Sequence, residues 1–176
     1  MYEVEVKVRA DLERVRRRLE SLDADFRGTT EQVDTYFDHP ARALAETDEA
    51  LRIRRSDGDA TLTYKGPKVD ERSKTREELQ TPIDDPWSAT QLLEALGFEP
   101  VADVEKRRER FAIDGVTVTL DCVAGVGEFV EAERGGERVE LDELRTEVKA
   151  VLERVGLDPA EQVRRSYLEL LLNSRE

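Results

Sequence analysis

The sequence has one cysteine and one histidine in 176 residues, and this scarcity excludes several kinds of site. A disulfide framework, a structural zinc site of Cys and His ligands and a Cys–His nucleophile pair all need more of these residues. Cys122 lies in the apolar-rich run VTVTLDCV, so we expect it to be a buried packing residue. His39 precedes Pro40 at the end of a predicted strand, so we expect a turn residue rather than a ligand.

Long apolar runs and linker-like stretches are also absent. No run is long and apolar enough for a signal peptide or a membrane span, which predicts a cytoplasmic protein with no membrane partner. No interior stretch is rich enough in Pro, Gly and Ser to separate two domains, and the length suits one domain. We therefore predict a single domain over residues 1–176.

Positive charge is in deficit, because 28 Lys and Arg stand against 41 Asp and Glu for a net charge of −13. A strongly negative body is repelled by phosphate backbones, so we expect no nucleic acid partner. Disorder is the other interpretation of so many charges, but periodic apolar residues throughout the chain argue against it. An acidic surface suits a cytoplasm of high salt, where repulsion is screened, and this predicts a halophilic source.

Hydrophobic periodicity predicts about eight strands and four helices. The expected strands cover residues 2–9, 30–38, 50–56, 60–66, 72–81, 103–113, 116–123 and 128–134. The expected helices cover residues 12–22, 86–96, 140–155 and 159–173, and a short helical turn follows Pro40. Few of these strands are separated by a helix, so a mostly antiparallel sheet is expected.

Charged and apolar residues alternate within the strands. In the first strand Glu3, Glu5 and Lys7 share one face, and apolar side chains share the other. The same alternation places further charged residues together on one face of their strands: Arg52, Arg54, Lys65, Arg72, Lys74, Arg76, Glu78, Lys106, Arg108, Arg110, Asp121, Glu131 and Glu133. One face of the sheet is therefore predicted to be charged and the other apolar.

An ordinary sheet with one wet and one dry face would explain any single strand. A solvent-facing surface of so acidic a chain should carry mostly Asp and Glu, yet these faces concentrate Arg and Lys. A sheet of eight strands also tends to close, which turns one face into a lumen. We therefore predict an α+β fold, an eight-stranded antiparallel closed β-barrel with helices packed outside and the charged face inside.

A lumen of mixed charge is costly to desolvate unless a ligand and metal ions complete it. Arg and Lys match the oxygens of a polyphosphate, and carboxylates match hard cations such as Mg²⁺ or Mn²⁺. No GxxxxGK[ST] loop is present, and no GxGxxG follows a strand, so a phosphate group held at a helix N-terminus is not expected. The pattern indicates a metal–polyphosphate site.

Ordered motifs give this chain a family resemblance. Residues 3–7 form an ExExK motif, followed in order by DTYFD (34–38), ALRIR (50–54), TYKGP (63–67), a KxR pair (106–108), VTLD (118–121) and GEFVEAE (127–133). This set covers most of the chain and resembles the CYTH family, the triphosphate tunnel metalloenzymes, which include class IV adenylate cyclases and thiamine triphosphatases. The short chain, with no second helical domain, and the region VTVTLDCVAGVGEFVEAE look most like the class IV cyclase branch and its archaeal relatives. Together with the acidic composition, this resemblance predicts a haloarchaeal source.

The resemblance implies roles for individual residues of an eight-stranded tunnel. Catalytic roles are implied for Glu3, Glu5 and Lys7. Triphosphate binding is implied for Lys7, Arg52, Arg54, Lys65, Arg76, Lys106 and Arg108. Binding of the cofactor, Mg²⁺ or Mn²⁺, is implied for Glu3, Glu5, Glu78, Asp121, Glu131 and Glu133.

Three functions remain open from the sequence. The first is a class IV adenylate cyclase, which converts ATP to cyclic AMP and pyrophosphate. The second is a hydrolase of inorganic triphosphate, thiamine triphosphate or a nucleotide, which needs largely the same tunnel residues. The third is a non-catalytic module for polyphosphorylated ligands, which the full carboxylate set disfavours. The expected partner is a small-molecule triphosphate, and a homodimer is one assembly left open.

Overall fold

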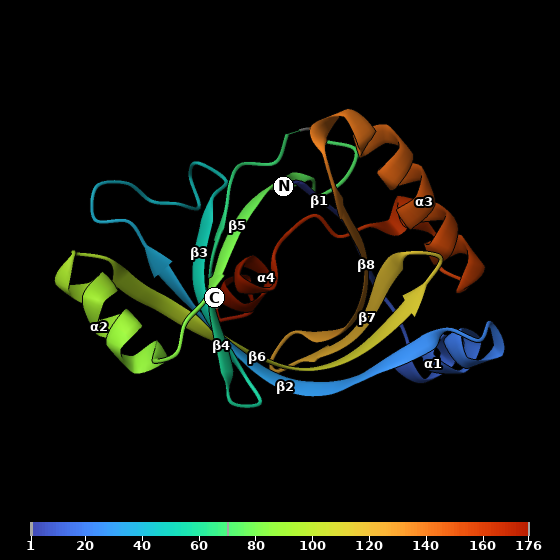
Figure 1. Cartoon of the computed structure of the whole chain (residues 1–176), viewed down its shortest axis with the longest axis horizontal. Coiled ribbons are helices and arrows are strands. Elements are labelled where there is room, and N and C mark those ends of the chain that lie inside the picture. Colours follow the sequence, from blue (N-terminus) through green and yellow to red (C-terminus); the bar gives the residue numbers. More distant parts are fainter. Residues whose placement is uncertain (1, 70, 176) are drawn as a thin grey trace.

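The predicted strands form, and the structure closes them into one barrel (Figure 1). The protein is described by a computed structural model that covers residues 2–69 and 71–175; Met1, Asp70 and Glu176 of the predicted domain lie outside the described residues. The strands are β1 (Tyr2–Arg9), β2 (Asp25–Asp38), β3 (Ala50–Ser56), β4 (Asp59–Lys65), β5 (Arg76–Pro82), β6 (Glu99–Ile113), β7 (Val116–Val123) and β8 (Gly127–Gly136). The predicted α+β closed barrel is confirmed.

Antiparallel pairing runs around the barrel in the order β1-β5-β4-β3-β2-β6-β7-β8, and β8 returns to β1. Two tight hairpins use residues in the left-handed region, Asp57-Gly58 between β3 and β4 and Asp114-Gly115 between β6 and β7. Such turns match the right-handed twist of the strands that they join. Closure leaves one face of every strand toward the lumen, which is the geometry that the alternation predicted.

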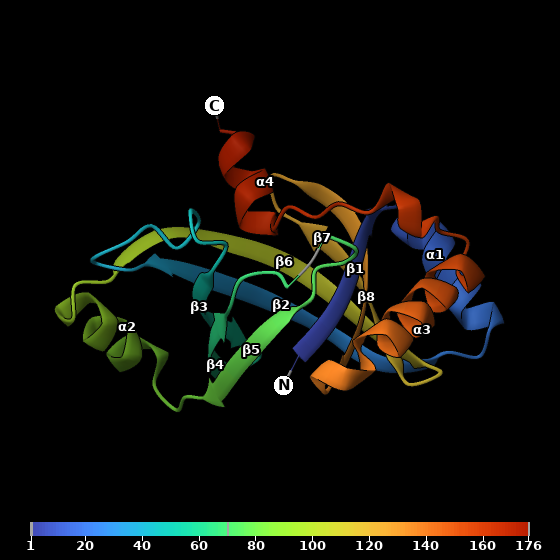
Figure 2. The same ribbon diagram turned by 90° about the horizontal axis from the view of Figure 1, so that it is seen from above.

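Three of the helices cover particular parts of the barrel (Figures 1 and 2). Helices α1 (Leu12–Ser21) and α3 (Leu141–Arg154) pack on the apolar outer face of β1, β7 and β8, in a core that includes Val6, Leu19 and Val148. Helix α4 (Tyr167–Asn173) sits at one end of the barrel, and in Figure 1 it is seen through the ring of strands. No helix in the described residues is both long and apolar enough to cross a membrane.

Helix α2 (Pro86–Ala95) differs from the other helices because it contributes no buried residue. It lies outside the barrel beside β3 and β6 and follows β5 directly in the chain. Its N-cap is Asp85, whose side chain accepts from the backbone of Trp87 and Ser88, and Pro86 occupies the first turn.

Two segments fold differently from the prediction. The expected helix over 159–173 is split into a 3₁₀ turn (Pro159–Glu161) and α4, because the chain between them runs along β1, where Val163 N donates to Lys7 O at 2.7 Å. The expected strand over 72–81 begins only at Arg76, since the preceding residues loop over the barrel and Lys74 N donates to Glu5 O.

Two smaller expectations are also wrong. Turns occupy the stretch after Pro40, which forms no helix, and His39 forms an isolated bridge with Arg42. Cys122 is exposed, because it lies on the outer face of β7 past the last residue, Leu120, that packs in the core with α1 and α3. The turn at His39 agrees with the prediction, and its Nδ1 accepts from Ala41 N.

The acidic composition gives a first prediction, on salt. Raising KCl from about 0.1 M to about 2 M at pH 7 should raise the melting temperature, because the Debye length falls below about 3 Å and repulsion among surface carboxylates is screened. At about pH 4 many of these carboxylates are protonated, so the same increase in KCl should have a smaller effect. A melting temperature insensitive to KCl at pH 7 would remove the argument for a halophilic source.

Candidate active site

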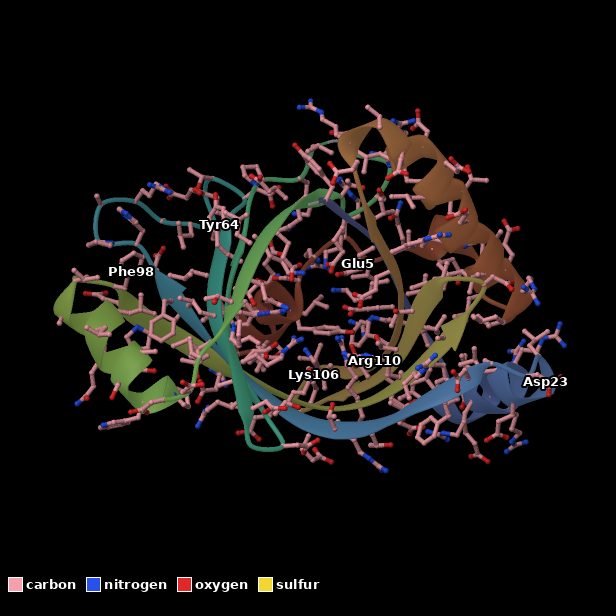
Figure 3. The ribbon with its side chains drawn as sticks, in the orientation of Figure 1. Glu5, Asp23, Tyr64, Phe98, Lys106 and Arg110 are labelled. Atoms are coloured by element: carbon pink, nitrogen blue, oxygen red, sulfur yellow. The ribbon has the colours of Figure 1, made fainter. Side chains whose placement is uncertain are left out.

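The inside of the barrel is a cavity of about 470 Å³. Its wall is built from β1 to β6, from β8 and from the start of α4. The side chains of Glu5, Lys106 and Arg110 point into it from different strands, whereas Asp23, Tyr64 and Phe98 lie outside it (Figure 3). A cavity of this size can hold a nucleotide-sized ligand.

Three carboxylates meet at one place in the cavity. Glu3, Glu5 and Glu133 each place one oxygen within 4.8 Å of the other two. Glu5 and Glu133 are direct partners across β1 and β8, and like charges in this arrangement destabilise a sheet. Burial raises the pKa of Glu3, and burial together with Glu3 raises the pKa of Glu133 to about 8. Three carboxylates that repel one another fit a divalent cation, which would displace the proton that Glu133 holds at neutral pH.

Ammonium groups flank the three carboxylates. Lys65 Nζ lies 2.9 Å from Glu3 Oε1, and Lys74 Nζ donates to Glu5 Oε1 at 2.7 Å. Burial alone would raise the pKa of Glu5, but the ammonium groups of Lys74, Lys7 and Lys65 hold it well below its usual range. Glu5 is therefore the member of the cluster whose ionised form the neighbouring ammonium groups favour most.

A second ionic network surrounds Asp34, which is fully buried. Arg54 Nε and Nη2 donate to its two oxygens at 2.6 and 2.7 Å, Lys106 Nζ donates at 3.1 Å and Arg52 Nη1 at 3.5 Å. Burial alone would raise the pKa of Asp34, but Arg52, Lys106 and Arg54 hold it well below its usual range. Two guanidinium groups and one lysine share one carboxylate, so this network keeps an excess of donors that suits phosphate oxygens.

A third network joins the barrel wall to α4. Arg108 Nε and Nη2 donate to Asp121 at 2.7 and 2.5 Å, and the same Nη2 donates to Glu131 at 2.7 Å. The hydroxyl of Tyr167 donates to Asp121 Oδ2 at 2.7 Å, and Lys7 Nζ lies 4.2 Å from the centre of its ring. These contacts fasten α4 to the lumen side of the strands, so that Ser166 and Tyr167 form part of the cavity wall.

Comparison with known proteins agrees with this geometry. Residues 1–167 match the CYTH domain. The chain belongs to the CYTH family. A CYTH relative from Methanocaldococcus jannaschii, provisionally named an adenylate cyclase, is 39% identical over 172 residues, which cover 97% of this chain and 98% of that protein. The adenylate cyclase CyaB of Aeromonas hydrophila is 30% identical over 143 residues, covering 80% of this chain and 72% of that protein. A solved structure from Pyrococcus horikoshii OT3 is 41% identical, covers 98% and 99% of the two chains and has a TM-score of 0.90.

CYTH tunnel enzymes depend on a divalent metal, and the structure brings most of the predicted site residues to the cavity. The predicted residues at its wall are Glu3, Glu5, Lys7, Arg52, Arg54, Lys65, Arg76, Glu78, Lys106, Arg108, Glu131 and Glu133. Glu78 pairs with Lys65 at 2.8 Å, beside Glu3. Asp121 is the exception, because Arg108 and Tyr167 engage its oxygens apart from the carboxylate cluster.

Sequence reasoning missed three groups of this CYTH site. Asp34 lies on the lumen side of β2, and its strand parity was a usable signal. Lys74 shared the charged parity, but it reaches the cavity from a loop. Tyr167 was hidden in a predicted continuous helix, although Ser166 and Glu169 form a capping box that marks a new helix start.

Two lysines of the tunnel titrate near neutral pH. Burial and the neighbouring Lys74 lower the pKa of Lys7 to about 7, while Glu131 and Glu5 limit the fall. Burial and the guanidinium groups of Arg108 and Arg54 lower the pKa of Lys106 to about 7. A bound triphosphate would favour the ammonium form of both groups.

These values predict proton uptake on binding. At pH 8 most Lys7 and Lys106 should be neutral in the free protein, and a bound polyanion raises their pKa, so metal-free binding of inorganic triphosphate should take up protons. Calorimetry in two buffers of different ionisation enthalpy measures this number. The variant Lys7→Met should take up fewer protons than the wild type. Binding with no proton uptake at pH 8 would contradict the lowered pKa values.

Proposed function

We propose that the protein is a class IV adenylate cyclase, which converts ATP to cyclic AMP and pyrophosphate. The observation that carries the proposal is one cavity lined by both a three-carboxylate cluster and an excess of phosphate-binding cations. The names of the relatives from Methanocaldococcus jannaschii and Aeromonas hydrophila support the cyclase over other triphosphate chemistry.

In this proposal the cationic side chains hold the triphosphate. Arg52, Arg54 and Lys106 already converge on Asp34, and exchange of part of that ion pairing for phosphate oxygens needs little movement. Lys7, Lys65, Arg76 and Arg108 complete the set. Of these, Arg108 is the most firmly oriented, because Asp121 and Glu131 hold its guanidinium group.

The cation is proposed to be Mg²⁺ or Mn²⁺, held by Glu3, Glu5 and Glu133 with Glu78 and Glu131 beside them. Ca²⁺ should support little activity, because it prefers looser and higher-coordinate sites than an in-line displacement suits. Asp121 remains a predicted metal ligand, but it does not belong to the cluster of Glu3, Glu5 and Glu133. When bound, the cation lowers the pKa of the attacking hydroxyl and offsets charge on the leaving pyrophosphate.

The reaction itself forms the bond from O3′ to the α-phosphorus, breaks the O3′–H bond, whose proton passes to solvent, and breaks the bond from that phosphorus to the bridging oxygen of pyrophosphate. The protein's contribution is to orient these atoms and to neutralise charge. Lys7, next to the carboxylate cluster, is proposed to contact the α-phosphate with Nζ in the ammonium form. His39 is no candidate for a general base, because it lies in a turn and its Nδ1 accepts from Ala41 N.

A product assay tests the proposal. The protein is incubated with ATP or with inorganic triphosphate, each with Mg²⁺, Mn²⁺, Ca²⁺ or excess chelator, and the products are separated. Cyclic AMP with pyrophosphate supports the cyclase. Orthophosphate from either substrate supports the alternative, a metal-dependent triphosphatase in which water replaces the 3′-hydroxyl. Binding without turnover would leave a non-catalytic module, and full turnover in chelator would remove the metal from the mechanism.

A homodimer through α2 is the assembly that we propose. Trp87, Leu92 and Leu96 at this helix are 70%, 65% and 69% exposed, and the helix buries no residue of its own. An apolar surface is complementary to a second copy of itself, whereas an acidic one is not.

The reducing cytoplasm, where ATP is available, is the proposed location, and the exposed unpaired thiol of Cys122 fits it.

The dimer gives a further prediction. Replacing Trp87 and Leu92 together by Ser should convert a dimer into a monomer, measured by light scattering after gel filtration. The melting temperature of the separated monomer should remain close to that of the wild type at low protein concentration, because neither side chain is buried in the barrel. A wild type that is monomeric at about 100 μM would contradict the proposal.

A further inference from the structure

Gln32 is a buried amide with an unused hydrogen-bonding atom at the cavity wall. Its side chain lies on the lumen side of β2, is 5% exposed and lines the cavity. Its Nε2 donates to Thr30 Oγ1 at 3.2 Å, whereas Oε1 has no hydrogen-bond partner among the described residues. A buried polar atom left without a partner costs about 1–3 kcal/mol, so a ligand that supplies a donor would remove a penalty.

Uncharged side chains lie near Gln32 on β2, β3 and β4, whereas its direct partner on β6 is Lys106. Ser56 is its direct partner on β3, Thr30 precedes it on the same face of β2, and Thr61 lies opposite Arg54 on β4. These four uncharged residues, which we call the neutral mouth, all line the cavity. Exposure rises along β2 from the fully buried Asp34 through Gln32 to the half-buried Thr30. The neutral mouth therefore lies at the end of the tunnel opposite α4.

Phosphate groups do not explain the neutral mouth. A tunnel made for inorganic triphosphate alone would continue its Arg and Lys on every strand, since each phosphate oxygen prefers a charged donor, whereas here β6 continues them with Arg108 and Arg110 and β2, β3 and β4 do not. An amide oxygen repels a phosphate oxygen, because both are acceptors. An uncharged hydrogen-bonding group beyond the cations instead matches the organic part of a substrate, which must lie outside its triphosphate.

We propose that Gln32 is a specificity-determining residue whose Oε1 accepts a hydrogen bond from an exocyclic amino group on the aromatic ring of an organic triphosphate. Adenine and the aminopyrimidine of thiamine both carry such a group, and a Gln side chain is a common partner of the adenine amino group in proteins. Thr30, Ser56 and Thr61 provide the remaining polar surface around the ring. The inference rests on the proposed function, because it assumes that the cations nearer α4 hold the triphosphate.

The test is a binding cycle without metal, measured by calorimetry. The ligands are ATP, purine riboside triphosphate, which lacks the 6-amino group, thiamine triphosphate and inorganic triphosphate. The proteins are the wild type, Gln32→Met, which keeps the side-chain volume without the amide, and Gln91→Ala, a control on the exposed surface of α2. Gln32→Ala repeats the measurement if the methionine does not fold.

Loss of the amino group should weaken binding to the wild type and to Gln91→Ala by ~10-fold, the value of one buried hydrogen bond, and to Gln32→Met by less than ~2-fold. If Gln32→Met instead weakens thiamine triphosphate and spares ATP, the ring is the aminopyrimidine. The inference would be overturned if loss of the amino group weakened binding equally in the wild type and in Gln32→Met. It would also be overturned if Gln32→Met weakened the binding of inorganic triphosphate as much as that of the organic triphosphates. Those outcomes leave the proposed function intact if products still form with metal; the absence of products would contradict the proposed function alone.

Discussion

Replacing Glu5 by Gln should abolish metal-dependent turnover and weaken the binding of Mn²⁺ by at least ~100-fold. Glu5 is one of three carboxylates whose oxygens lie within 4.8 Å of one another, and neighbouring ammonium groups hold its pKa well below the usual range. Metal-free binding of inorganic triphosphate should survive or improve. Lys65 and Lys74 remain in this variant, and one competing anion is gone.

Glu77→Gln is the matched control, because Glu77 is exposed on β5, next to Arg76 and Glu78 at the cavity wall. This variant should keep the metal affinity and turnover of the wild type. Calorimetric titrations of Mn²⁺ and of triphosphate into the three proteins separate metal binding from phosphate binding. Unchanged Mn²⁺ affinity in Glu5→Gln would place the metal elsewhere in the tunnel.

Replacing Asp34 by Asn should destabilise the protein strongly. Asp34 is fully buried and is the shared acceptor for Arg52, Arg54 and Lys106, so the amide would leave the guanidinium groups of Arg52 and Arg54 without their counter-charge and Lys106 without an anionic partner. Removal of one partner from a buried ion pair costs about 3–5 kcal/mol, measured here as the free energy of unfolding in urea. Inorganic triphosphate should raise the melting temperature of this variant more than that of the wild type, because it supplies the missing negative charge.

Asp103→Asn controls for the change of side chain, since Asp103 is exposed on the neighbouring strand β6 and accepts a hydrogen bond from Thr35. Its effect on the free energy of unfolding should be within about 0.5 kcal/mol. If Asp34→Asn is as stable as the wild type and gains nothing extra from triphosphate, the cations of the tunnel are already compensated by other groups.

Much of the barrel could be predicted because a strand alternates its side chains between two faces. The parity of Glu3, Glu5 and Lys7, repeated on other strands, correctly identified the lumen and most of the residues that line it. Helices with a clear apolar stripe, such as α1 with Leu12, Val15 and Leu19, were also predicted well. Local periodicity was sufficient wherever one face meets the core and the other does not.

Parity could not show which charges pair inside the closed barrel. Asp34 meets Lys106 across 72 positions of sequence, and Lys74 meets Glu5 across 69, so both pairs depend on how the strands close. Tyr167 could not be placed, because the direction of α4 is set by the segment that runs along β1 before it. These pairings also decide which carboxylates are left for a metal, and they take Asp121 away from that group.

Helix α4 lies across one end of the barrel (Figure 1), and this has a consequence for the order in which molecules leave. A substrate whose triphosphate lies among the cations near Tyr167 must enter with its phosphates first. After cleavage the organic product sits nearer the neutral mouth, and the pyrophosphate sits behind it. The organic product must therefore depart before the pyrophosphate, which is also the more highly charged of the two. If both products leave through the neutral mouth, pyrophosphate is released last. Pyrophosphate is then the product that competes directly with the next substrate for the empty tunnel.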